Sequence, residues 1–122
     1  MSVGACPLGV FDSVSMVALS SALDGLAERQ RVIANNVANL QTPGYHAQRV
    51  QFEDALTQAV AHGSGSATAT VSRSLEPTRA DGNNVNLDTE TLSNVDTNLR
   101  YQLATQAVSA QLSGIRAAMR TV

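Results

Sequence analysis

The side chains most often used in catalysis and metal binding are sparse in this sequence of 122 residues. His46 and His62 are the only histidines, and neither has a second ligand at the spacing that a protein metal site requires. Glu53 and Asp54 are adjacent; because neighbouring residues on a helix point in different directions, we predict that they form a solvated face rather than flank one bond. Cys6, the single cysteine, excludes an internal disulfide and is interpreted as an incidental thiol. No G-x-S-x-G nucleophile turn and no glycine-rich phosphate loop occurs, so the sequence predicts no catalytic residue, no cofactor, no metal site and no enzyme.

Asparagine side chains supply the most distinctive polar chemistry of the chain. A first motif, Ala34–Tyr45 (ANNVANLQTPGY), contains Asn35, Asn36 and Asn39. An amide both donates and accepts hydrogen bonds, so amides buried between helices would form directional networks that specify one packing. A simple helix end would explain one asparagine and the Pro-Gly pair. The placement of Asn35 and Asn39 one turn apart on one face favours an interface, and both interpretations stay open.

Two turn signals follow from the motifs. Pro43-Gly44 has the residues of a type II turn, with positive φ at the glycine, which would end the first helix near residue 40. A second motif, Asp81–Asp88 (DGNNVNLD), suits turn positions and leads into the C-terminal helix, with a short extended piece at 83–87 and Asp88 as the predicted N-cap. The predicted turn and signature residues are Thr42, Pro43, Gly44, Tyr45, Gly82, Asn83, Asn84 and Asn86.

Long helices at the two ends would position these motifs. The N-terminal helix is predicted from a heptad-like seam with one polar member, Gln30, which can fix the register of a partner helix. The C-terminal helix begins with one apolar stripe and continues with another, shifted by about two positions. The seam consists of Met16, Leu19, Leu23, Leu26, Gln30, Ile33, Val37 and Leu40. The C-terminal stripes consist of Leu92, Val95 and Leu99, then Tyr101, Ala104, Val108, Leu112, Ile115 and Met119.

The predicted fold is mainly α: two long terminal helices pair as a hairpin or coiled coil beside a loosely structured middle segment. Within that middle segment, residues 46–61 are a weaker helix candidate and residues 62–74 are predicted to be a flexible loop. The predicted segments are a variable N-terminal segment (1–15), an N-terminal helix (16–40), a segment of turn, short helix and loop (41–89) and a C-terminal helix (90–121).

The composition limits the classes of partner. Leu, Ile, Val and Phe total 29 residues, so a single copy has a thin core and is expected to need partners to fold fully. Net charge is −2 and the arginines are dispersed, which argues against nucleic-acid binding. No apolar stretch is long enough for a membrane span, and no secretory signal is visible, so we expect no membrane insertion and no cleaved signal peptide.

These motifs also carry a family resemblance. The run Leu26–Asn39 (LAERQRVIANNVAN), continuing to Thr42–Tyr45 (TPGY), resembles the N-terminal signature of bacterial flagellar rod and hook proteins, the flagellar axial family. Segments Arg49–Leu56, Gly82–Asp88 and Arg100–Gln102 are similar to its short, proximal-rod members. The resemblance implies a structural subunit of the flagellar basal body that polymerises through its terminal helices into a tubular rod. That rod would cross the periplasm and transmit torque for motility.

The resemblance further implies the partners and the route. The partners would be the rod proteins FliE, FlgC and FlgF, the inner ring of the basal body and the flagellar type III export apparatus, with homo- and hetero-polymeric contacts. The chain departs from the family at Leu40-Gln41 and Ala110-Gln111. The alternative class is a soluble regulatory or chaperone-like helical hairpin that binds a partner reversibly. The candidate assembly interface is Leu19, Leu23, Leu26, Ile33, Asn35, Asn36, Val37, Asn39, Leu92, Val95, Leu99, Tyr101, Val108, Leu112, Ile115 and Met119.

Overall fold

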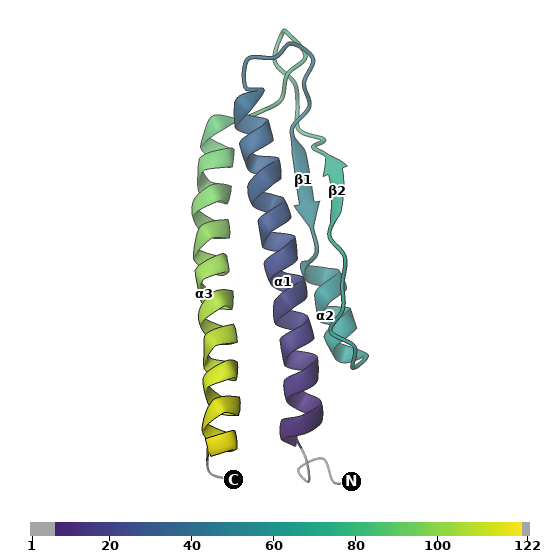
Figure 1. The fold of residues 1–122 in the computed structure, drawn as a ribbon. Coiled ribbons are helices and arrows are strands. Elements are labelled where there is room, and N and C mark those ends of the chain that lie inside the picture. Colours follow the sequence, from purple (N-terminus) through teal and green to yellow (C-terminus); the bar gives the residue numbers. More distant parts are fainter. Residues whose placement is uncertain (1–6, 121–122) are drawn as a thin grey trace.

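A computed structural model describes residues 7–120, with side chains from residue 13 onward; Cys6 lies outside the described residues. Helix α1 lies in the middle, helix α3 runs antiparallel along one side, and a β-hairpin with helix α2 covers the other side (Figure 1). The mainly α fold with two long, paired terminal helices is confirmed. The elements are α1 (Pro7–Ala38), β1 (Gln48–Gln51), α2 (Glu53–Ala61), β2 (Thr70–Arg73) and α3 (Leu87–Arg120).

Helix α1 starts earlier than the sequence pattern predicts. It begins at Pro7, whereas the predicted helix covers residues 16–40. Proline is well tolerated in a first turn because the missing N–H has no partner there. The helix ends at Ala38, and a turn follows in which the Tyr45 N–H donates to Thr42 O at 3.2 Å. Gly44 has φ +76°, which confirms the predicted positive-φ glycine.

The middle segment is more ordered than predicted. Residues 46–61 do not form one helix, because residues 48–51 pair as β1 with the antiparallel strand β2 and only Glu53–Ala61 is helical. The register joins Gln48 to Arg73 and Gln51 to Thr70. The predicted loop 62–74 therefore contains a strand. Pairing buries Val50 on the core side of the sheet, which a helix at this position would not do.

The loop between α2 and β2 is held against α1. Ser21 Oγ donates to Gly65 O at 3.1 Å and accepts from the Ala67 N–H at 3.2 Å. Gly65 has φ +72°, and a Cβ there would lie 2.8 Å from Val14 O, so the loop backbone passes directly over the helix. These contacts anchor a segment whose composition predicts mobility.

The apolar core lies between α1 and the hairpin. It is centred on the buried side chains of Leu26, Val32, Val50 and Phe52. Gly25 makes room for it, since a Cβ at this position would lie 2.6 Å from the Phe52 ring. Gly25, which lies beside the seam, therefore meets a packing requirement while it lowers helix propensity. Partly buried neighbours are Ala22, Leu56, Ala69, Tyr101 and Ala104.

Helix α3 turns an unusually polar face toward α1. The Gln30 side chain, the polar member of the seam, donates to Asn98 Oδ1 at 2.9 Å across the two helices. Thr97 is fully buried on this face, whereas the apolar row that begins α3 is exposed on the other side. The predicted shift between the two stripes is therefore a change of face along one helix. None of the described helices has the length and apolarity needed to cross a bilayer.

Candidate functional site

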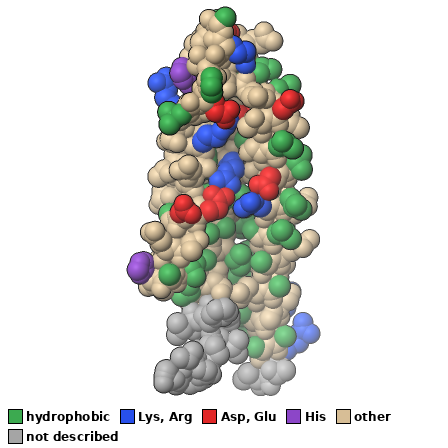
Figure 2. All heavy atoms as spheres, turned by 180° about the vertical axis from the view of Figure 1, so that it is seen from behind, with side chains coloured by type: hydrophobic (Ala, Val, Ile, Leu, Met, Phe, Trp, Pro, Cys, Tyr) green, Lys and Arg blue, Asp and Glu red, His purple; other side chains and the backbone are tan. Residues whose placement is uncertain are grey.

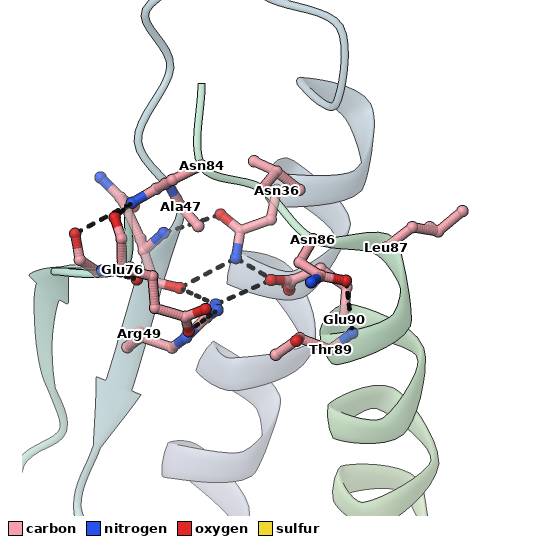
Figure 3. Close-up of polar contacts among 12 residues, drawn as sticks. Asn36, Ala47, Arg49, Glu76, Asn84, Asn86, Leu87, Thr89 and Glu90 are labelled. Carbon is pink, nitrogen blue, oxygen red and sulfur yellow. Dashed lines mark hydrogen bonds and ion pairs between the residues drawn. The ribbon is translucent and has the colours of Figure 1, made fainter. Parts of the chain in front are cut away.

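Buried asparagines join the elements at the end of the molecule where α1 stops and α3 starts, which we call the apex. Asn36 is fully buried in the last turns of α1. Its amide pairs with both backbone groups of Gln48 in β1, donating to Gln48 O and accepting from Gln48 N–H, each at 3.0 Å. The amide thus occupies the strand edge that faces α1 (Figure 3). Tyr45 Oη adds a hydrogen bond to Asn36 Oδ1 at 3.3 Å.

The same amide reaches the third element through Glu90. Asn36 Nδ2 donates to Glu90 Oε1 at 3.0 Å, and Arg49 Nη1 donates to Glu90 Oε2 at 2.9 Å. Glu90 is fully buried, so its charge depends on these two donors. Arg49 also lies 3.7 Å from Glu76 (Figure 3). One residue from each of α1, β1 and α3 therefore meets in a buried polar cluster that fixes their relative positions. Both carboxylate oxygens of Glu90 have donors, whereas Arg49 Nη2 has no hydrogen-bond partner among the described residues.

Asn83 closes the end of α1. Its amide donates to Asn39 O at 2.9 Å, Leu40 O at 3.2 Å and Thr42 O at 2.8 Å, and its Oδ1 accepts from the Val85 N–H at 2.7 Å. These three carbonyls belong to the turn that follows α1, which ends at Ala38. Asn83 thus holds this turn from a segment more than forty residues away in the chain.

Asn84 and Asn86 likewise hydrogen-bond to backbone groups, at the strands and at the start of α3. Asn84 Oδ1 accepts from the Ala47 N–H at 2.6 Å, and its amide donates to carbonyls of Ser74 and Glu76, which ties β1 to the end of β2. Asn86 Oδ1 accepts from the N–H groups of residues 88 and 89 at 2.9 and 3.3 Å and so caps α3. The predicted N-cap, Asp88, was wrong: it lies inside the helix, because the helix starts two residues earlier.

The two apical turns pack against each other. Gly82 has φ +83°, and a Cβ there would lie 3.3 Å from Gly44 Cα. The Gly44 N–H donates to Asp81 O at 2.8 Å. Turn residues of the two predicted motifs, more than thirty residues apart in the chain, therefore meet at one place.

A second polar group lies below the apex. Arg29 donates to both carboxylate oxygens of Glu53, at 2.6 and 2.8 Å, and to Val50 O at 2.7 Å, and its guanidinium lies 4.9 Å from the Phe52 ring centroid. These hydrogen bonds from Arg29 lower the pKa of Glu53 from 4.5 to about 2. Arg100 of α3 approaches Glu53 to 3.7 Å. Glu53, predicted to lie on a solvated face, is partly exposed and also pairs with Arg29, while Asp54 is exposed as predicted.

Every buried carboxylate or amide oxygen described above accepts from a named donor, so these groups join the elements that carry them. Among residues 7–120, no group of three or more His, Cys, Asp or Glu side chains could hold a metal ion. The cluster is therefore a structural joint.

Within the single chain, the predicted interface residues fall into three groups, and their role between copies stays a prediction. Buried are Leu26, Ile33 and Asn36. Half-buried are Leu19, Leu23, Asn39, Tyr101 and Val108. Exposed are Asn35, Val37, Leu92, Val95, Leu99, Leu112, Ile115 and Met119.

The predicted turn residues also differ in how deeply they are buried. Some residues of the joint were not predicted from the sequence at all. Asn83 and Asn84 are buried, and Asn86 is exposed. Arg49, Glu90 and Arg29 were missed as members of the joint. A weak signal existed for Arg49 and Glu90, namely opposite charges beside the two asparagine motifs. Exposed or half-buried at the turns are Thr42, Pro43, Gly44, Tyr45 and Gly82.

Comparisons with known proteins bear on the same segments. The family described as "Flagella basal body rod protein" matches residues 16–46, which cover most of α1 and the turn after it. The chain is 31% identical to flagellar basal body rod protein FlgB of Escherichia coli, over 77% of this chain and 84% of that protein. The chain belongs to the FlgB family.

Two further rod proteins, one named FlgB and one named FlgG, are also similar to this chain. Flagellar basal body rod protein FlgB of Salmonella typhimurium is 30% identical, over 77% of this chain and 84% of that protein. Flagellar basal-body rod protein FlgG of Caulobacter vibrioides is 44% identical over a shorter stretch, 37% of this chain and 18% of that protein. The FlgB-family likeness thus extends over most of the chain, and the likeness to the longer rod protein covers only part of it.

Proposed function

We propose that this chain is a non-enzymatic structural subunit of the flagellar basal-body rod that assembles through an outward-facing apolar row on α3. We call Leu92, Val95, Leu99 and Leu103 the α3 row; their exposed fractions are 72%, 62%, 55% and 58%. This exposure is the single observation that carries the proposal. In the space-filling view, hydrophobic side chains line the edge formed by α3, beside a central band of charged groups (Figure 2).

The α3 row is suited to helix packing. Its spacing of three or four residues places the side chains on one face, opposite the face that contacts α1. Contiguous apolar surface of this kind marks interaction sites in soluble proteins. Covering each side chain would contribute about 1 to 2 kcal/mol, so the row as a whole can support a specific contact.

The partner surface proposed for the row is the uncovered face of α1 in a neighbouring subunit. Ala34, Ala38 and Val37 are exposed there, and small side chains allow close approach of a second helix. Because the α3 row and this α1 face are different surfaces, the contact is heterologous, and repeated heterologous contacts build open helical assemblies.

The family resemblance supports a more specific proposal. The chain would occupy the proximal rod, beside FliE, FlgC and FlgF and the inner ring, in a rod that crosses the periplasm and transmits torque. It would be exported by the flagellar type III apparatus without cleavage of a signal peptide. The short middle segment, 41–89, favours a proximal-rod subunit because it leaves no room for a large additional domain.

Replacing Leu99 tests the row. Leu99→Arg places a charge in the α3 row while leaving the α1-facing side untouched, so the chain is expected to fold and to be lost from purified basal bodies, with loss of motility. Asn94→Arg is the matched control, since Asn94 is exposed on α3 away from the row. Normal incorporation of the Leu99 variant would contradict the assigned surface. A discrete cytoplasmic oligomer and motile deletion strains would instead favour the regulatory hairpin.

A further inference from the structure

The apex carries an apolar side chain without cover and an apolar pocket without an occupant. Leu75, just after β2, is 98% exposed. A pocket of about 370 Å³ opens between the end of α1 and the start of α3, with Leu40, Pro77, Val85 and Leu87 as its apolar walls. Resting on the proposed function, we propose that Leu75 of one copy fills the apical pocket of a second copy of this chain, beside it in the rod.

A chain cannot fill its own pocket with Leu75. The ladder of the hairpin continues past β2, since the Ser74 N–H donates to Ala47 O at 2.7 Å. In extended chain, successive side chains point to opposite sides. Glu76 lines the pocket and approaches Arg49, whereas Leu75 is almost fully exposed. Leu75 itself does not line the pocket and stays exposed in its own chain.

The positions of the two features favour a neighbour at the same height. Leu75 is exposed and does not line the pocket of its own chain, so a second copy displaced sideways can bring one against the other. An apolar knob that enters a pocket elsewhere on an identical molecule makes a heterologous contact, which propagates rather than closing as a dimer. The pocket wall Leu87 is 48% exposed, so the pocket opens at the surface beside the start of α3.

Charge complementarity points to the same occupant. Arg73, the last residue of β2, lies two residues before Leu75 in the chain. Asp88 follows the pocket residue Leu87. Both charged side chains are exposed, and none of the ion pairs among the described residues includes either of them. Docking of Leu75 would bring this arginine toward the aspartate of the neighbour.

Disulfide trapping tests the contact in assembled basal bodies. In a Cys6→Ser background, the full-length double variant Leu75→Cys/Leu87→Cys should form a ladder of cross-linked multimers on oxidation, and each single variant should form none. Leu75→Cys/Val60→Cys is the matched control, because Val60 is 45% exposed but lies at the far end of the hairpin. It should give no ladder.

A substitution gives a second readout that does not depend on cysteines. Leu75→Asp should leave the unfolding of the isolated chain unchanged, because Leu75 makes almost no contact within it. It should lower incorporation into basal bodies by roughly tenfold or more, as expected for losing one buried leucine from a contact. Thr78→Asp, an exposed residue of the same loop, should incorporate normally.

The outcomes separate the contact from the function. A ladder from the 75/87 pair alone, together with poor incorporation of Leu75→Asp, supports the contact. Wild-type chain present in basal bodies without that ladder, or normal incorporation of Leu75→Asp, overturns the contact and leaves the rod function standing. Absence of the wild-type chain from basal bodies overturns the rod function and the contact together.

Discussion

The joint at the apex predicts a large stability loss when the buried carboxylate of Glu90 is replaced by an amide. Glu90→Gln keeps the size of the side chain and an oxygen that can accept from Asn36. It removes the negative charge that faces Arg49 at 2.9 Å. The arginine is then left beside an amide, with only Glu76 within ion-pair distance, at 3.7 Å.

The expected magnitude follows from burial. Removing one partner of a buried ion pair typically costs about 3 to 5 kcal/mol. The Arg49 side chain is 30% exposed and keeps Glu76 nearby, so the loss should lie at or just below the low end of this range, at about 2 to 3 kcal/mol. Glu76→Gln is the matched control. Because its side chain is 51% exposed, the loss there should stay below about 1 kcal/mol.

Urea unfolding followed by tyrosine fluorescence measures the loss. The chain has no tryptophan, and its two tyrosines, Tyr45 and Tyr101, lie beside the joint and in the α1–α3 contact. With a denaturant slope of about 1 to 3 kcal/mol per molar, the Glu90→Gln midpoint should fall by roughly 1 to 2 M.

A double variant tests whether the unpaired charge of Arg49 causes the loss of stability in Glu90→Gln. Arg49→Met/Glu90→Gln removes both charges and should be more stable than Glu90→Gln alone, since the unpaired arginine is the source of the cost. A Glu90→Gln midpoint equal to that of Glu76→Gln would refute the reasoning, because it would mean that the buried pair carries no net stability.

Two further predictions concern packing and pH. Gly25→Ala should destabilise the chain by about 1 to 3 kcal/mol in the same assay, because its Cβ would lie 2.6 Å from the Phe52 ring. Gly114→Ala, which has open space around it, is the control and should stabilise the helix by about 0.5 to 1 kcal/mol. Equal effects of the two substitutions would contradict the packing argument. Because Arg29 lowers the pKa of Glu53 from 4.5 to about 2, the stability from this pair is fully present above pH 4.5 and lost as pH falls toward 2. The Glu53 side chain is 41% exposed, so solvent screening reduces the contribution to about 1 kcal/mol. The stability difference between wild type and Glu53→Gln, measured by urea unfolding at pH 7 and pH 2.5, should shrink at the lower pH, and a constant difference would count against the pair.

Sequence patterns predicted the parts of the fold that depend on residues close together in the chain. The long helices follow from apolar spacing, and the positive φ at Gly44 follows from the Pro-Gly pair. Gln30 was predicted to fix helix register, and it does hydrogen-bond across to α3. For the long helices and the Gly44 turn, the cause lies within a few residues of the effect.

The features that were not predicted depend on contacts between residues far apart in the chain. The sequence favoured Asn35 and Asn39 as a pair on one face, yet Asn36 is the buried one, because β1 and Glu90 pack against its side of α1. Strand β2 was predicted as loop because its composition is small and polar. Such a strand becomes stable only when β1 is aligned beside it, which no local pattern records.

The asparagines of the apex impose an order in time on the folding of this chain. A ribosome makes the protein from residue 1 onward, so α1 and β1 exist before Asn83, Asn84 and Glu90 have been synthesised. Until then the end of α1 lacks its cap and Arg49 lacks its main carboxylate partner. The nascent chain therefore cannot close its joint until its last third is present, which keeps it loosely folded through most of its synthesis.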